Sequence, residues 1–224
     1  MELLALIVVV VLGAAGYFWW RARGAAEPKE NQEAASKTVA NLEPGDGLRF
    51  WDDDIRLVDA VLECTEQVGT RTTQWAWVIL DDGRLVETAP DGNMLYRTPE
   101  VLHQGSAAFE QLTGAEGVLK TFEQKVREGV AGSQPAHFGH GRSIYQVKST
   151  GTFGASIKGK LPKEEVLRDI STQASDNVYV EMEAAFGEVA LGIWTTHIAL
   201  YLGQPLKESD VMSIYPKGKE TKSQ

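Results

Sequence analysis

The order of hydrophobic and polar positions divides the chain into a short apolar beginning and a long region of alternating pattern. Residues 3–20 form an apolar run without a charged side chain. Residues 44–216 instead alternate between short apolar stretches and turn-forming Gly, Pro, Asp and Asn. The first pattern is typical of a membrane-spanning helix and the second of short β-strands. The sequence therefore predicts one membrane anchor and one β-rich domain.

The predicted anchor begins at Leu3 and is long enough to cross a bilayer. As a helix, residues 3–20 span about 27 Å, close to the thickness of the hydrocarbon core. Its far end carries aromatic and basic side chains, namely Tyr17, Trp19, Trp20, Arg21 and Arg23. Aromatic rings favour the headgroup region, and positive charge stays on the cytoplasmic side. We therefore expect a single-pass anchor over residues 1–23, with the N-terminus outside and the domain in the cytoplasm.

A cleaved secretory signal is the alternative for this segment, because Gly24, Ala25 and Ala26 supply the small residues that a signal peptidase recognises. The positive charges argue against it, since they follow the apolar run and a signal peptide has them before it. Residues 24–43 are rich in Ala, Glu, Lys, Gln and Ser and are expected to be a polar linker. Residues 217–224 form a basic tail.

Tight turns join the strands predicted in the first half of the domain. The turn Asp52–Asp53–Asp54 joins the first two strands, and Asp82 and Gly83 lie in the turn of a second hairpin. In chain order, the predicted strands are residues 48–51, 55–62, 74–80, 84–88 and 94–97. Together they predict an antiparallel meander.

A helical insertion is predicted over residues 98–141. Thr98 and Pro99 form a helix-start signal, with a capping hydroxyl followed by proline at the first helical position. The apolar residues expected to be buried are Phe109, Leu112, Leu119, Phe122 and Val126. Gly105, Gly114 and Gly117 are expected to divide the insertion into shorter helices, and a loop rich in Gly, Pro and His follows from Gly129.

The last third has the clearest strand pattern. In residues 177–184, Val178, Val180 and Met182 alternate with Tyr179, Glu181 and Glu183. Further strands are predicted at residues 143–148, 153–157, 189–194 and 198–202, with a short helix at residues 162–170. The predicted fold class is α+β and mostly β: an antiparallel meander with partly closed, barrel-like sheets and a helical insertion.

Charge and cysteine content restrict the function. The formal net charge is -9, and the acidic excess falls within residues 44–216. The domain therefore lacks the clustered positive charge that binding to nucleic acid phosphates requires. Cys64 is the single cysteine, so the chain forms no intramolecular disulfide and no thiolate metal cluster. We expect Cys64 to be a small buried residue in a protein of a reducing compartment.

Two motifs suggest cofactors but lack essential parts. Residues 154–161 approach a phosphate-binding loop, yet Leu161 stands where a Ser or Thr would hold magnesium. His137 and His140 are candidate metal ligands, which His103 and His197 could complete. No cysteine or carboxylate accompanies them in sequence, so a solvated loop is the preferred interpretation, and no cofactor is predicted.

The carboxylates and tryptophans are the remaining candidates for a site. Glu181 and Glu183 share one strand face, and we expect a solvated face there, as we expect a solvated turn at Asp52–Asp53–Asp54. No nucleophile elbow or dinucleotide-binding glycine run is present, so no catalytic residue is assigned. Trp75 and Trp77 also share a face. Core packing is their preferred interpretation, as for Trp51 and Trp194, and an aromatic groove for a ligand is the second.

Short segments at both ends of the domain resemble a bacterial family called the domain of unknown function 4178 family. They are residues 42–46 (Leu-Glu-Pro-Gly-Asp), Trp75 or Trp77 with Leu80, Asp82 and Gly83, residues 188–192 (Glu-Val-Ala-Leu-Gly), and residues 214–216 (Ile-Tyr-Pro). The resemblance implies a mostly β domain at or near a bacterial inner membrane. It implies no catalytic residues.

Three functional hypotheses follow. The first is a membrane-anchored, non-catalytic interaction module in an envelope-associated assembly, with a protein partner. The second is a sensor or binder of a small cationic ligand such as a polyamine, which the acidic domain would attract into an aromatic pocket. The third is an enzyme of unknown type. A pocket lined by tryptophan and carboxylates would favour the second hypothesis, and a flat apolar patch would favour the first.

Overall fold

The computed structural model describes residues 37–218, except for residues 91, 162–166, 168 and 174–176. The predicted anchor, most of the linker and most of the basic tail lie outside the described residues, as does most of the helix predicted at residues 162–170. Among the described residues, no helix has the length and apolar character needed to cross a membrane. The described residues from Thr38 onwards belong to one compact unit. The description below concerns that unit alone.

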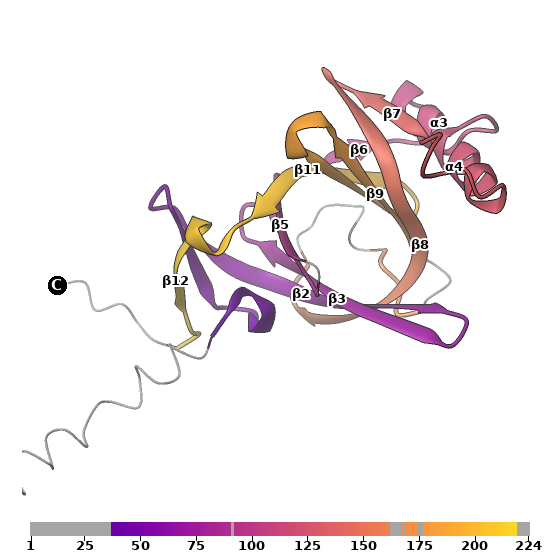
Figure 1. The fold of residues 1–224 in the computed structure, drawn as a ribbon. Coiled ribbons are helices and arrows are strands. Elements are labelled where there is room, and N and C mark those ends of the chain that lie inside the picture. The colour runs from indigo at the N-terminus through magenta and orange to yellow at the C-terminus, as the bar shows by residue number, and fades with distance from the viewer. Residues whose placement is uncertain (1–36, 91, 162–166, 168, 174–176, 219–224) are drawn as a thin grey trace, which may run out of the picture. The chain divides into compact units, whose positions relative to one another are not determined.

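Eight antiparallel strands close into a barrel (Figure 1). Around the barrel the strands follow the order β2, β3, β4, β5, β11, β10, β9 and β8, and β8 pairs with β2 to complete the circle. The strands are β2 (Ile55–Val68), β3 (Arg71–Leu80), β4 (Leu85–Ala89), β5 (Gly92–Tyr96), β8 (Ser143–Gly159), β9 (Asn177–Ala184), β10 (Val189–Trp194) and β11 (Ile198–Leu206). The predicted β-rich fold is confirmed, and the barrel is fully closed.

Two long strands belong both to the barrel and to a flanking sheet. The start of β2 pairs with β1 (Gly47–Phe50), which pairs in turn with β12 (Val211–Tyr215). The start of β8 pairs with β7 (His137–His140). The sequence predicted two separate strands in the region that β8 spans without interruption. The phosphate-loop-like residues 154–161 fall largely within this strand, so their backbone is not a phosphate-binding loop.

Large apolar side chains fill the inside of the barrel. They alternate with outward-facing residues on every strand and include Leu62, Trp77, Phe153, Leu191 and Tyr201. Leu167 and Ile170 pack against this group. Asp169 accepts a hydrogen bond from the Thr196 hydroxyl in the β10–β11 turn, at 3.2 Å. Leu167 and Ile170 therefore close the end of the barrel at which this turn lies.

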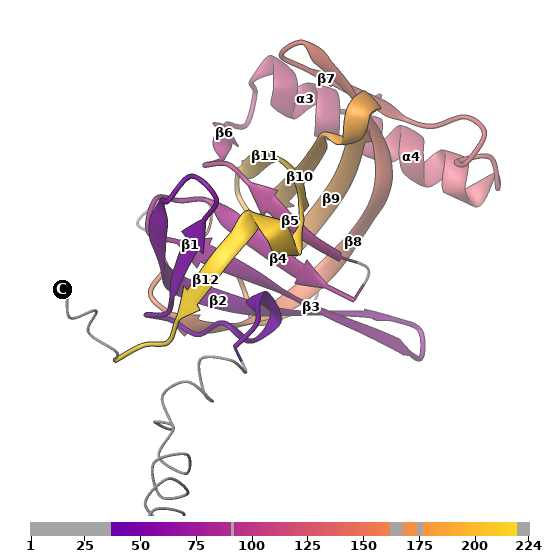
Figure 2. The ribbon, with the colours of Figure 1, turned by 60° about the vertical axis from the view of Figure 1, so that its left-hand side comes forward.

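Two further layers cover the outside of the barrel (Figure 2). On one side lie β7 and two short helices, α3 (Ala107–Thr113) and α4 (Val118–Arg127). Their apolar residues pack on outward-facing residues of β8, β9 and β10. On another side, β1, β12 and the short 3-10 helix η1 (Val39–Asn41) cover β2, β3 and β4. The strands are therefore buried on both faces, which explains why some of them lack polar positions.

The helical insertion differs from the prediction at both ends. Residues 100–102 form strand β6 (Glu100–Leu102), which pairs with β11, and the Thr98 hydroxyl donates to the carbonyl of Asp82. The first helix begins after Ser106, whose hydroxyl accepts a hydrogen bond from the Phe109 amide. Strand β7 lies where a loop was predicted. Pairing with strands distant in sequence therefore outweighs the local helix-start signal.

Inside the insertion, most details are confirmed. Gly114 ends α3 and Gly117 precedes α4. The predicted buried residues Phe109, Leu112, Leu119 and Phe122 are buried. Val126, in the last turn of α4, is the exception, with 53% of its surface exposed.

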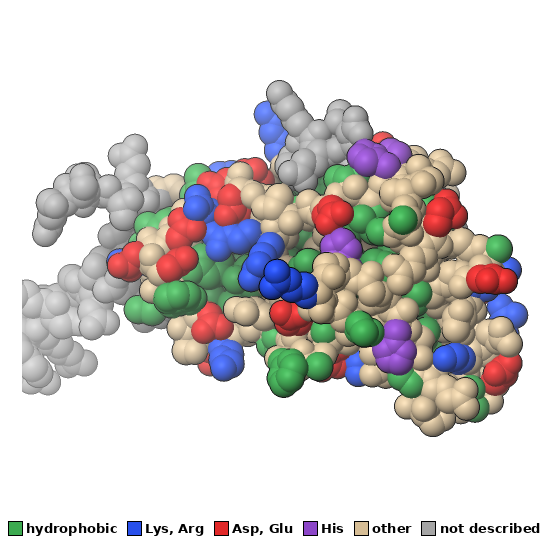
Figure 3. All heavy atoms as spheres, turned by 90° about the horizontal axis from the view of Figure 1, so that it is seen from above, with side chains coloured by type: hydrophobic (Ala, Val, Ile, Leu, Met, Phe, Trp, Pro, Cys, Tyr) green, Lys and Arg blue, Asp and Glu red, His purple; other side chains and the backbone are tan. Residues whose placement is uncertain are grey.

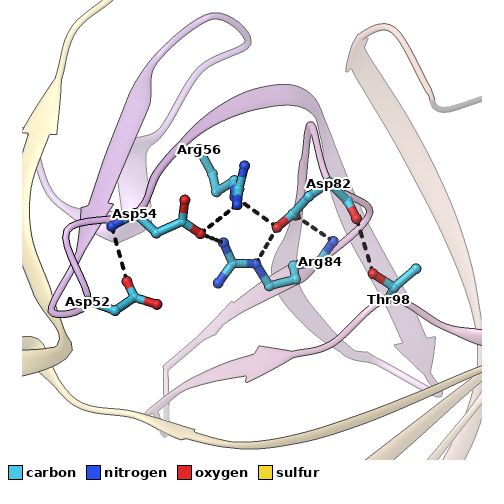
Figure 4. A network of polar contacts seen from close by, with 6 residues as sticks. All are labelled: Asp52, Asp54, Arg56, Asp82, Arg84 and Thr98. Carbon is cyan, nitrogen blue, oxygen red and sulfur yellow. Dashed lines mark hydrogen bonds and ion pairs between the residues drawn. The ribbon is translucent and has the colours of Figure 1, made fainter.

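A network of two arginines and two aspartates joins two turns (Figure 4). Arg84 binds Asp54 at 2.8 Å and Asp82 at 2.6 Å, and Arg56 binds the same two carboxylates at 2.7 and 3.0 Å. Asp54 belongs to the acidic turn before β2, whereas Asp82 lies between β3 and β4. The predicted solvated turn is therefore correct for the exposed Asp52 and wrong for Asp54, which is partly buried in this network.

Two predictions at the edge of the domain also need correction. Residues 39–41 form η1, and Leu42 is buried in the outer apolar layer, so the folded unit begins before residue 44. Trp51 was expected in the core, but 71% of its surface is exposed. It follows the end of β1, in the turn where the chain leaves the sheet.

Candidate functional site

A cavity of about 630 Å³ occupies the end of the barrel opposite the β10–β11 turn. Residues that line it include Trp75, Glu87, Tyr96, Tyr179 and Glu181. Gly187, in the turn between β9 and β10, lies at its mouth. Aromatic rings and carboxylates thus meet inside the barrel, in a space of the size that small-molecule sites have.

Strand register brings these residues together. On β3, Trp75 and Trp77 lie two positions apart and so face the same side. Trp77 pairs directly with Glu87 on β4, and Glu87 pairs with Met94 on β5. The closed barrel places the inward face of β9 across from these strands. Trp77 packs in the core, as its preferred interpretation predicts, and the half-buried Trp75 lines the cavity.

Glu87 is the most deeply placed carboxylate of the cavity, with 7% of its surface exposed. The Trp77 indole N–H donates to its Oε2 at 3.2 Å, and the Tyr96 hydroxyl donates to the same oxygen at 3.3 Å. Burial raises the pKa of Tyr96, and the nearby charges of Glu87 and Glu181 raise it further. Tyr96 therefore remains a neutral hydrogen-bond donor to the carboxylate at physiological pH.

Glu181 faces the inside of the barrel, which contradicts the prediction of a solvated strand face. It is half-buried, and it accepts a short hydrogen bond from the Ser149 hydroxyl. Glu183, two residues further on, is exposed as predicted, and its Oε2 lies 2.9 Å from the Nζ of Lys148. The β8–β9 register shifts between Val147 and Ser149, which lets the consecutive residues Lys148 and Ser149 reach two carboxylates on the same face.

A third carboxylate adjoins the aromatic wall. The Tyr179 hydroxyl donates to Glu66 Oε2 at 3.0 Å, and its ring packs edge-to-face on Trp75 with 5.4 Å between ring centroids. Burial raises the pKa of Tyr179, and the charge of Glu66 adds to this effect. Gly151 faces the same space, where a side chain would overlap the Glu66 carboxylate. The wall is therefore held by hydrogen bonds and ring contacts together.

A larger, more open hollow of about 1160 Å³ runs along β2 and β3 and shares Trp75 with the barrel cavity. Its lining contains one charged residue, Glu63, which is paired with Lys158 at 2.5 Å. Threonine, glutamine and alanine side chains make up much of the rest. This hollow brings no group of ionisable side chains together, so the barrel cavity is the stronger candidate site.

The histidines lie apart from this cavity. His137 and His140 are three positions apart on β7, so they face opposite sides, and His140 lies 3.1 Å from Glu100. The rings of His103 and His197 contact each other elsewhere, with 5.0 Å between centroids. Histidine side chains are scattered over the face shown in Figure 3. Within the described part of the chain, no three His, Cys, Asp or Glu residues are placed to hold a metal ion.

Cys64 is buried, as predicted, and lies on the inner face of the barrel. Burial raises the pKa of its thiol well above the usual value, and the charge of Glu87 has the same effect. A thiol without thiolate character is a poor nucleophile. Cys64 therefore packs in the core and takes no chemical part in the site.

Sequence reasoning missed Glu66, Glu87, Tyr96 and Tyr179 as site residues. One usable signal was available for Glu87. Counting outward from the three-residue loop Asp81–Asp82–Gly83 in an antiparallel hairpin pairs residue 87 with residue 77, which places an acidic side chain beside a tryptophan on one face. No comparable local signal connects Tyr179 with Glu66, because these residues lie far apart in sequence.

Comparison with known protein families, curated proteins and solved structures finds no match for this chain.

Proposed function

We propose that the barrel binds a small organic cation carrying an ammonium group. The observation that carries this proposal is the cavity in which Glu87 and Glu181 lie among the rings of Trp75, Tyr96 and Tyr179. Aromatic faces attract cations, and carboxylates bind ammonium groups through charge-assisted hydrogen bonds. This combination was the sequence criterion for the ligand-sensor hypothesis, which we therefore prefer to the interaction module.

The depth of the carboxylates supports a cation over a neutral guest. A buried carboxylate is costly unless its charge is balanced and its oxygens accept hydrogen bonds. Trp77, Tyr96 and Ser149 supply neutral donors to Glu87 and Glu181. An ammonium group between the two carboxylates would add positive charge and three donors at the place of greatest negative charge. The acidic domain as a whole would also attract cations towards the mouth.

Calorimetric titration of the full-length chain in nonionic detergent tests the proposal. The ligands are n-pentylamine, 5-aminopentanoate and 1,5-diaminopentane, with pentan-1-ol as an uncharged match. We expect at least one amine to bind and the alcohol not to bind. Glu181→Gln should weaken amine binding by about tenfold, the loss expected for one charge-assisted hydrogen bond. Glu123→Gln on the exposed face of α4 should leave it unchanged. The absence of binding by every amine at millimolar concentration would refute the proposal.

A second candidate function rests on the sheet formed by β12, β1 and β2. Trp51, Ile55, Leu57 and Met212 are exposed apolar side chains of this region. Within the described residues, β12 pairs with β1 alone and leaves its other edge open. Exposed edges accept a further strand from a partner. We therefore infer, as the second candidate function, that the domain binds an extended segment of another protein along β12.

Photo-crosslinking from position 212 on β12 tests this second function, with position 120 on α4 as the control. Crosslinks from Met212 should map to one extended segment of a single protein, and Lys120 should give none to that protein. Equal crosslinking from both positions would contradict it. The inner-membrane anchor, the cytoplasmic placement of the domain and the resemblance to the domain of unknown function 4178 family stay predictions. Protease accessibility from each side of sealed membrane vesicles would test the placement.

A further inference from the structure

We infer that the ligand is a zwitterion, bound with its ammonium end inside the barrel and its anionic end at the mouth. This inference rests on the proposed function and names the chemical class of the ligand. The proposed function rests on the two inner carboxylates. The zwitterion inference rests on a different property, the order of positive and negative side chains from the interior of the cavity to its mouth.

The negative charges lie deep in the cavity. Glu87 is buried, and Glu181 is half-buried opposite Leu191, in the middle of β10. The direction of β9 places Glu183 two residues closer to the mouth than Glu181, a step of about 7 Å along a strand. Glu183 is also the most exposed carboxylate of the lining, with 48% of its side chain accessible.

The positive charges lie at the mouth. Lys148 is 45% exposed and pairs with Glu183, which cancels the charge of the outer carboxylate. Arg71 also lines the cavity, is exposed, and lies at the start of β3, six residues before Trp77. Within the part of the chain that the structure describes, the Arg71 guanidinium makes no ion pair. Among the charged residues that line the cavity, the three at the rim, Arg71, Lys148 and Glu183, therefore sum to +1, and the two in the interior are both carboxylates.

This order of charges selects among amines. A ligand with a second ammonium group would place it beside Arg71 and Lys148, where like charges repel. A ligand with a carboxylate at the same end would be attracted, and a guanidinium binds a carboxylate through two parallel hydrogen bonds. The uncharged end of an alkylamine would be neither repelled nor attracted by these two side chains. We therefore expect ω-amino acids to bind more tightly than alkylamines, and alkylamines more tightly than diamines.

A matched ligand series tests the inference. For each chain length from four to eight carbons, the ω-amino acid, the n-alkylamine and the α,ω-diamine are titrated calorimetrically into the full-length chain at neutral pH. At the best length, we expect the amino acid to bind about tenfold more tightly than the alkylamine, the value of one charge-assisted pair. Arg71→Gln should remove most of this difference while leaving alkylamine affinity within about twofold.

Two further variants distinguish the effect of charges at the rim of the cavity from the effect of the overall charge of the protein. Lys148→Met should also reduce amino acid binding, and it should strengthen diamine binding because it frees Glu183. Lys158→Gln changes an exposed lysine that is paired with Glu63 outside the barrel. It should change neither the affinity for ω-amino acids nor the affinity for diamines. Diamines that bind as tightly as amino acids would overturn the zwitterion inference and leave cation binding intact. If Arg71→Gln kept the full preference for ω-amino acids over alkylamines, that result would also overturn the zwitterion inference. The absence of binding by all three classes would refute the proposed function itself.

Discussion

Trp77 donates its indole N–H to a buried carboxylate, Glu87, directly across the β3–β4 pair and 3.2 Å away. The same oxygen of Glu87 accepts a hydrogen bond from Tyr96 on the next strand, β5. Three neighbouring strands therefore share one polar contact inside the barrel. The carboxylate proposed to bind a ligand also depends on its neighbours for its own stability.

Replacing Trp77 should destabilise the barrel strongly. Trp77→Phe removes a donor to a buried carboxylate and leaves unfilled volume, for a combined loss of about 2–4 kcal/mol in the free energy of unfolding. Tyr96→Phe removes one hydroxyl with little change in volume and should cost about 1 kcal/mol. Urea unfolding followed by circular dichroism measures both. Equal losses in the two variants would contradict this account of Trp77.

The arginine network between the two turns should contribute to stability. Arg84 is 19% exposed and bonds two carboxylates, so Arg84→Met should lower the free energy of unfolding by about 1–3 kcal/mol, the usual cost of leaving partly buried charges unpaired. Arg49 forms an exposed pair with Asp53, and Arg49→Met should lower the free energy of unfolding much less, because solvent screens the pair. Thermal unfolding of both variants checks the difference, and similar melting temperatures would count against it.

Gly159 should tolerate alanine much less well than Gly69. Both glycines have a positive φ, +87° and +61°, which costs an alanine about 1–2 kcal/mol. At Gly159 a side chain would also lie 2.7 Å from Pro44 Cγ, whereas Gly69 has open space around it. Overpacking of this kind adds about 1–3 kcal/mol. Gly159→Ala should therefore have the lower melting temperature, and a Gly69→Ala protein that melts first would disprove the steric explanation.

Stability should fall in alkaline solution because of Cys64 and Tyr96. Burial raises the pKa of both groups above their usual values of 9.0 and 10.0. Above pH 9 the unfolded chain loses these protons and the folded chain keeps them, so the unfolded state gains stability as the pH rises. Each group contributes a slope of up to about 1.4 kcal/mol per pH unit.

Urea unfolding between pH 8 and pH 11 measures this slope. Cys64→Ala should remove the part of the slope that begins near pH 9. Tyr96→Phe should reduce the part that begins near pH 10, to which the buried Tyr179 also contributes. A wild-type protein whose stability rises over this interval would contradict the direction of both pKa changes.

Local pattern was sufficient for the strands of the first half. Asp82 and Gly83 fixed one hairpin, and alternation fixed which residues share a face, so Trp75 and Trp77 were correctly placed together. Alternation cannot show what covers each face. Glu181 alternates with Val180 and Met182 as it would on a solvated strand, but the helices cover the apolar side and the barrel encloses the other.

The candidate site escaped prediction because it depends on closure of the barrel. Tyr179 meets Glu66, and Trp75 meets Tyr179, only after β8 and β9 have come round to β2. Turn signals and periodicity act over a few residues and carry no information about such distant pairs. The same limit explains the error at Thr98 and Pro99, where pairing of β6 with β11 replaced the expected helix.

The seam between β2 and β8 has a consequence for the order of folding. It joins residues such as Glu63 and Lys158, which are 95 positions apart in the chain, whereas the hairpins from β2 to β5 join close neighbours. Contacts between distant residues form late, since a long loop must first lose its freedom. The cavity can therefore exist only in chains that have completed the slowest step, and a half-folded domain would expose its strand edges without any binding site.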